Sequence, residues 1–164
     1  MAIILPKLSR YRSTKNSAPQ AQPAVEVAFC RDDARYVGGE VMRCNWQVRP
    51  GALGAAVRDA KKRMDSSDGL ALSCLEASVM WFTEGKGDED IHVHHFQRYS
   101  ASHYPEGLSG QPQFLRTQLP VSPISYHGKL LRICWCLRLR LFIENGREIV
   151  AQHPFVLLPS HAPR

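Results

Sequence analysis

Three histidines, His92, His94 and His103, are the residues whose types and spacing best suit metal chemistry. Neutral imidazole is a common ligand of zinc and iron, and residues two apart in a strand project from one face. Metal sites built on a histidine pair of this spacing add a glutamate a few residues later. Arg98 occupies that stretch, and the next glutamate, Glu106, lies in a predicted loop. We therefore expect surface histidines and no metal or other cofactor, with a metal-dependent enzyme as the alternative.

An acidic loop at residues 85–90 contains Lys86, Asp88 and Asp90. Alternating carboxylates suit calcium, but a calcium loop also needs a closing bidentate glutamate, and none follows. The loop lacks the Gly-Lys-Ser/Thr ending of a phosphate-binding loop. The pattern favours a solvated hairpin tip, and these three residues are candidates for binding a partner.

Three arginines, Arg132, Arg138 and Arg140, alternate with apolar residues and form a predicted basic stripe on one face of a strand. Guanidinium groups bind carboxylates and phosphates through paired hydrogen bonds, so the stripe could receive an acidic or phosphorylated peptide. It could equally keep the sheet solvated and prevent edge pairing. Both interpretations stay open at this stage.

Nucleophilic catalysis finds little support in the sequence, and we expect no enzyme activity. No Gly-x-Ser-x-Gly elbow is present, and Cys134 and Cys136 lie in the middle of a predicted strand. The five cysteines are an odd number, which favours free, mostly buried thiols and a cytoplasmic location. The N-terminal stretch is too short for a signal peptide, and no apolar run is long enough for a transmembrane segment.

The elements that must position these residues are strands, because apolar and polar residues alternate along most of the chain. The clearest strand runs over 130–143, followed by an Asn145-Gly146 hairpin signal and a return strand over 147–157. Further strands are predicted at 25–29, 42–48, 75–81, 91–99 and 114–119, and a short helix or a loop at 53–64. The pattern indicates an all-β, antiparallel, immunoglobulin-like β-sandwich.

The predicted organisation is a flexible basic tail at 1–23, one sandwich at 24–158 and a short C-terminal tail at 159–164. The chain has 164 residues and a net charge of +6, part of which lies in the N-terminal tail. A basic tail could touch an anionic surface, but Trp46, Trp81 and Trp135 fall on predicted inward faces. They are therefore poor stacking platforms, and we expect no nucleic acid as partner.

Four segments of the chain resemble motifs of arrestin-like proteins. Residues 36–41 (YVGGEV) resemble the opening Y-x-P-G-E segment, with Gly38 in place of the usual proline. Residues 120–128 (PVSPISYHG) are similar to the P-S-Y-x-G segment, and 131–139, with Trp135 inside, to the strand that follows it. Residues 154–157 (PFVL) resemble the closing strand. In order and spacing these motifs cover one arrestin-like sandwich, whereas members of the family generally have two.

The resemblance implies a scaffold or adaptor that binds a protein partner through loops or an exposed edge strand. The loops concerned are 53–65, 85–90 and 100–113, together with the arginine stripe. The alternatives are a metal-dependent sandwich enzyme that uses His92, His94 and His103, and a structural subunit that assembles into a homo-oligomer. The sequence does not name the partner.

Overall fold

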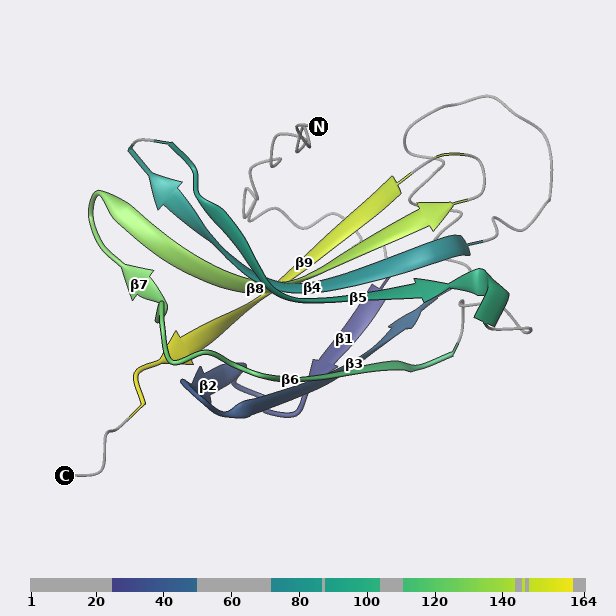
Figure 1. Ribbon diagram of the computed structural model, residues 1–164, viewed down its shortest axis with the longest axis horizontal. Helices are drawn as coiled ribbons and strands as arrows, with labels where there is room; N and C mark the ends of the chain where they lie inside the picture. Colours follow the sequence, from purple (N-terminus) through teal and green to yellow (C-terminus); the bar gives the residue numbers. More distant parts are fainter. Residues whose placement is uncertain are drawn as a thin grey trace, which may run out of the picture.

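A computed structural model describes residues 25–49, 72–86, 88–103, 111–143, 146 and 148–160. Figure 1 shows two facing β-sheets, one of three strands in the order β1-β3-β6 and one of six. The larger sheet has the order β2-β9-β8-β4-β5, and β7 pairs with β8. The strands are β1 (Val25–Phe29), β2 (Arg35–Val37), β3 (Val41–Val48), β4 (Leu72–Gly85), β5 (Ile91–Ser100), β6 (Gln113–Gln118), β7 (Tyr126–His127), β8 (Leu131–Ile143) and β9 (Glu148–Leu158).

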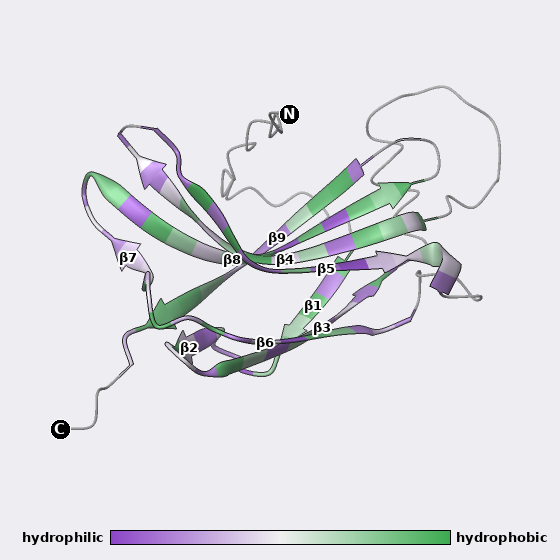
Figure 2. Cartoon of the chain, viewed as in Figure 1, coloured by the Kyte–Doolittle hydropathy of each residue, from purple (hydrophilic) through white to green (hydrophobic). Residues whose placement is uncertain are grey.

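The alternation in the sequence places one face of each sheet in a shared core. Along β3 every second residue is buried, and Trp46 is 1% exposed. Trp135 in β8 is also 1% exposed and belongs to the same core cluster. Figure 2 shows the alternating hydropathy along the strands. The predicted all-β sandwich is therefore confirmed, and its core lies between the two sheets.

Two predicted segments, 1–23 and 53–65, lie outside the described residues. Within the described part, no helix is long and apolar enough to cross a membrane. The only helical element described there is one 3-10 turn, η1 (Ala101–His103), in the predicted loop after β5.

The segment 31–39 contains β2, which runs parallel to the end of β9. A three-residue strand is too short to show an alternating pattern, so its pairing could not be predicted. Glu40 stabilises the turn that follows. Its carboxylate accepts hydrogen bonds from the Val37 N–H and from Arg31 Nε, each at 2.9 Å. The Glu40 carbonyl accepts from the Leu119 N–H (2.8 Å), which continues the β3–β6 pairing.

The segment 120–128 passes along the end of the sandwich and is fixed there by hydrogen bonds. The Trp135 indole donates to the Pro123 carbonyl at 2.8 Å, and Ser125 exchanges two hydrogen bonds with Leu157. Tyr126 is 55% exposed, so its ring lies outside the core. It lies in the two-residue strand β7, and its ring packs beside Gly128, where an added Cβ would be 2.5 Å from Cε1.

Candidate functional site

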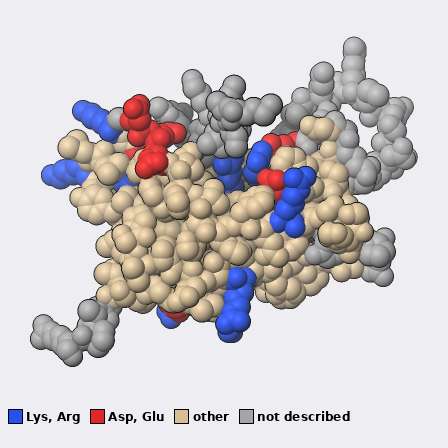
Figure 3. Space-filling model, viewed as in Figure 1, with Lys and Arg blue, Asp and Glu red and all other residues tan. Residues whose placement is uncertain are grey.

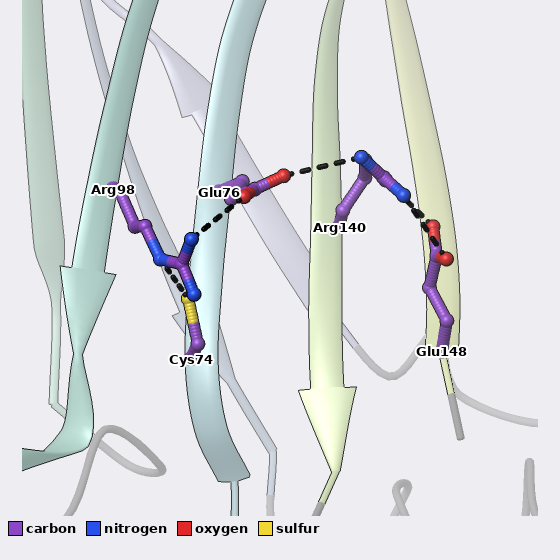
Figure 4. A network of polar contacts seen from close by, with 5 residues as sticks. All are labelled: Cys74, Glu76, Arg98, Arg140 and Glu148. Atoms are coloured by element: carbon purple, nitrogen blue, oxygen red, sulfur yellow. Dashed lines mark hydrogen bonds and ion pairs between the residues drawn. The ribbon is translucent and has the colours of Figure 1, made fainter. Parts of the chain in front are cut away.

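The predicted arginine stripe lies on the outer face of the large sheet, where carboxylates neutralise part of it. Arg140 contacts two carboxylates: its Nε is 2.6 Å from Glu148 Oε1, and its NH1 is 3.2 Å from Glu76 Oε2. Figure 4 shows that Glu76 lies between Arg140 and Arg98, which donates through Nε to Cys74 Sγ at 3.0 Å. This outer-face network of Cys74, Glu76, Arg98, Arg140 and Glu148 crosses four strands.

The hydrogen bond from Arg140 holds the pKa of the Glu148 carboxyl below its usual value and raises the pKa of the guanidinium. Both groups therefore stay charged near neutral pH and satisfy each other. Arg132 likewise lies 3.7 Å from Glu84. Arg138 differs from the other two, since its Nε is buried without a hydrogen-bond partner in the described part of the chain. A peptide-binding role of the stripe remains a prediction, and Arg138 is its least neutralised member.

The acidic loop forms the hairpin between β4 and β5. The Thr83 N–H donates to the Asp90 carbonyl at 2.9 Å, and the Asp90 N–H donates to Thr83 Oγ1 at 2.8 Å. The Lys86 N–H donates to the Leu130 carbonyl at 3.1 Å, which ties the hairpin to the start of β8. Asp88 and Asp90 are both exposed. Among the described residues, no three histidine, cysteine or acidic side chains gather as a metal site would require.

Two of the three candidate metal ligands, His92 and His94, contact tryptophans. The His92 ring stacks on Trp81 at 5.8 Å between centroids, and the His94 ring meets the edge of Trp135 at 6.1 Å. His103 lies in η1, beyond the opposite end of β5 from His92, a separation of more than about 20 Å along a strand. The three candidate ligands therefore do not converge.

A β-bulge in β5 also changes which residues share a face. Val79 pairs with His95, but Met80 pairs with Val93, so His94 is the extra residue. By strict alternation along β5, Phe96 and Arg98 would lie on the same face as His92 and His94. They pair with Ser78 and Glu76 and project from the outer face instead, because one extra residue reverses the alternation.

On the side of the sandwich where β5 and β6 lie, the edge strands of the two sheets differ in whether other groups hydrogen-bond to them. Two carbonyls on the outer edge of β6 are capped by side chains of β5. The Tyr99 hydroxyl donates to the Phe114 carbonyl at 2.8 Å, and His94 Nε2 donates to the Gln118 carbonyl at 2.7 Å. Strand β5 itself pairs only with β4 in the described structure, and it is ten residues long.

The edge of β5 that has no partner among the described strands carries exposed apolar side chains. Thr83 and Asp90 are hydrogen-bonded partners, so the alternation of an antiparallel ladder turns the N–H and C=O of Val93 away from β4. The extra residue of the bulge, His94, shifts the alternation by one, so beyond it Phe96 and Arg98 are the residues that turn away. Val93 is 47% exposed and Phe96 is 53% exposed. This edge therefore offers both backbone groups and apolar side chains to another chain.

Sequence reasoning missed a second group of charged residues, on the outer face of the small sheet. Arg43 in β3 and Arg116 in β6 are direct cross-strand partners, and both are exposed. Each lies at a polar position of an alternating strand, which the sequence does show. Their adjacency depends on the pairing of two strands distant in the sequence, which the sequence does not show.

Three of the cysteines, Cys44, Cys134 and Cys136, are poor candidates for nucleophilic chemistry. All five thiols are free. Burial raises the pKa of Cys44 and of Cys136 to about 12, and burial likewise raises the pKa of Cys134. A thiol with a raised pKa is protonated at neutral pH and is a poor nucleophile.

Comparisons with known proteins give no family for this chain. No family model matches it, and no curated protein matches its sequence. Among solved structures, Spo0M, a sporulation control protein from Bacillus subtilis, is 14% identical with a TM-score of 0.48, and the match covers 85% of this chain. The chain spans about half of Spo0M, since the match covers 51% of it. Superoxide reductase (neelaredoxin) from Ignicoccus hospitalis is 5% identical with a TM-score of 0.42, covering 83% of this chain and 81% of the other.

Proposed function

We propose that this chain is a non-enzymatic protein-binding module of arrestin-like type, and that it binds its partner by adding a strand to the free edge of β5. The observation that carries the proposal is the contrast between the two neighbouring edges. Side chains of β5 cap carbonyls of β6, whereas β5 presents Val93 and Phe96 beside a backbone edge that has no partner among the described residues. Strand addition uses main-chain hydrogen bonds for affinity and alternate side chains for specificity.

The arrestin-like assignment is supported by where the motif residues lie. Tyr36 is fully buried, and its ring packs against Phe155 of the closing segment at 5.8 Å between centroids. Trp135 packs against the same Phe155, also at 5.8 Å. Three of the four motifs thus meet in one aromatic cluster of the core.

Two substitutions at one position test the strand addition. Phe96→Ala removes the side chain and keeps the N–H, whereas Phe96→Pro also removes the outward N–H that a bound strand would accept from. We expect Phe96→Ala to weaken capture of a partner from extracts of the source cells and Phe96→Pro to abolish it. Equal capture by Phe96→Pro and the unaltered protein would contradict the proposal.

A second copy of the chain is the other possible occupant of this edge. The molecular mass in solution, measured over a range of concentrations, distinguishes a second copy of the chain from a different protein partner. A dimer that Phe96→Pro dissociates would favour the self-assembling subunit, whereas a monomer that still captures a partner favours the adaptor.

A further inference from the structure

The outer face of the small sheet carries two arginines that no acid of the described residues neutralises. Arg43 and Arg116 lie directly opposite each other, and neither has an ion pair with an acid in the described part of the chain. Like charges placed directly opposite in a sheet destabilise it. On the large sheet, by contrast, Arg98, Arg132 and Arg140 each have a carboxylate within 4 Å. The fold therefore places two positive charges side by side without a carboxylate from the described residues between them.

These arginines line a hollow of about 420 Å³. Ala28 and Asn45 are small side chains on its floor, and Phe114, which is 65% exposed, lies beside Arg116 on the same face of β6. A second hollow of about 570 Å³ shares Ala28 and Asn45 with the first. The two hollows therefore adjoin at Ala28 and Asn45, and together they suit an extended chain better than a compact molecule.

We propose that these hollows bind an acidic peptide segment in extended form, with carboxylates on Arg43 and Arg116 and an apolar side chain against Phe114. Paired guanidinium groups recognise carboxylates through charge-assisted hydrogen bonds. Nucleic acids bind through many phosphate contacts, whereas this site offers two arginines beside one exposed aromatic ring. A short acidic segment with an apolar side chain therefore fits it better than a nucleic acid. Figure 3 shows basic side chains on the lower, small-sheet side, where few acidic atoms are in view.

This inference rests on the proposed protein-binding function. Gln97 of β5 also lines the hollow, but the residues that would hold the peptide, Arg43, Phe114 and Arg116, lie in β3 and β6. The probe is a random library of twelve-residue peptides displayed on phage and selected on the full chain. We expect the selected peptides to carry Asp or Glu next to an apolar residue. Their affinity is then measured by fluorescence anisotropy with labelled copies.

The decisive variant is Arg43→Gln with Arg116→Gln, which we expect to weaken binding about 100-fold, tenfold for each charge-assisted contact. The control is Arg35→Gln with Lys129→Gln, which removes two charges from exposed positions elsewhere and is expected to change affinity less than about threefold. Selected peptides that lack acids, or that bind the Arg43/Arg116 variant as tightly as the unaltered chain, would overturn the proposal. A single-stranded oligonucleotide that binds at these arginines more tightly than every selected peptide would overturn it too.

The outcomes also separate this proposal from the preceding one. If Phe96→Pro abolishes partner capture and the library yields no acidic peptide, the edge function stands and the arginine site is wrong. If acidic peptides bind at Arg43 and Arg116 while Phe96→Pro changes nothing, the arginine site stands and the edge function is wrong.

Discussion

At the scale of single residues, the presence or absence of a nearby carboxylate distinguishes arginines that stabilise the sheet from arginines proposed to bind a partner. Arg140 lies between Glu76 and Glu148 and acts as a cross-strand tie in the large sheet. Arg43 and Arg116 are chemically the same but face each other without an acid in the described structure. The sequence shows that all three occupy polar positions of alternating strands. Strand pairing decides which of them is neutralised, so the role of each could not be predicted.

The large-sheet network makes a prediction about stability. The Glu76 side chain is only 12% exposed and contacts both Arg98 and Arg140. We expect Glu76→Gln to lower the free energy of unfolding by about 1–3 kcal/mol, since it leaves two guanidinium groups adjacent without a shared carboxylate. Urea unfolding measures this change.

The matched control is Glu84→Gln, which breaks the pair with Arg132, in which both side chains are 50% exposed. Exposed pairs contribute little, so the expected change is below about 0.5 kcal/mol. Equal losses for the two variants would show that burial of Glu76 does not matter and that the network is not a structural tie.

At the scale of elements, the alternation of residue types predicted six of the described strands closely: β1, β3, β5, β6, β8 and β9. It predicted only the central part of β4. It did not predict β2 or β7, which are too short for periodicity, nor the bulge at His94, which inserts one residue without any glycine or proline signal. The bulge matters for the candidate site, since it turns Phe96 outward and brings His94 to the Gln118 carbonyl.

The hairpin from β4 to β5 depends on one glycine. Gly85 has a φ of +151°, and an added Cβ would lie 2.1 Å from the Leu130 carbonyl oxygen. We expect Gly85→Ala to cost more than about 2 kcal/mol in the free energy of unfolding, because the backbone of two elements must separate. Thermal and urea unfolding both report this loss.

Gly146 provides the comparison within the same chain. Its φ is +80°, and no atom lies within 4 Å of an added Cβ, so Gly146→Ala is subject to the backbone strain alone. That strain is about 1–2 kcal/mol. A Gly85→Ala variant no less stable than Gly146→Ala would contradict the close approach of Gly85 to β8.

At the scale of the whole molecule, the residues that form the core are distinct from the surfaces proposed to bind a partner. The motif residues Tyr36, Trp135 and Phe155 are buried between the sheets, so the resemblance they carry concerns the core. The surfaces proposed for recognition are the free edge of β5 and the outer face of the small sheet. Neither contains a motif residue, which is why the sequence predicted the fold far better than it predicted the site.

Hydrogen exchange of the backbone amides, measured on the free chain and on its complex with a captured partner, tests the edge of β5 most directly. The amides of Val93, Phe96 and Arg98 point away from β4, so we predict fast exchange in the free chain and strong protection in the complex. Amides of β4 and β8 should exchange slowly in both. A complex in which these three amides still exchange fast would contradict strand addition at β5.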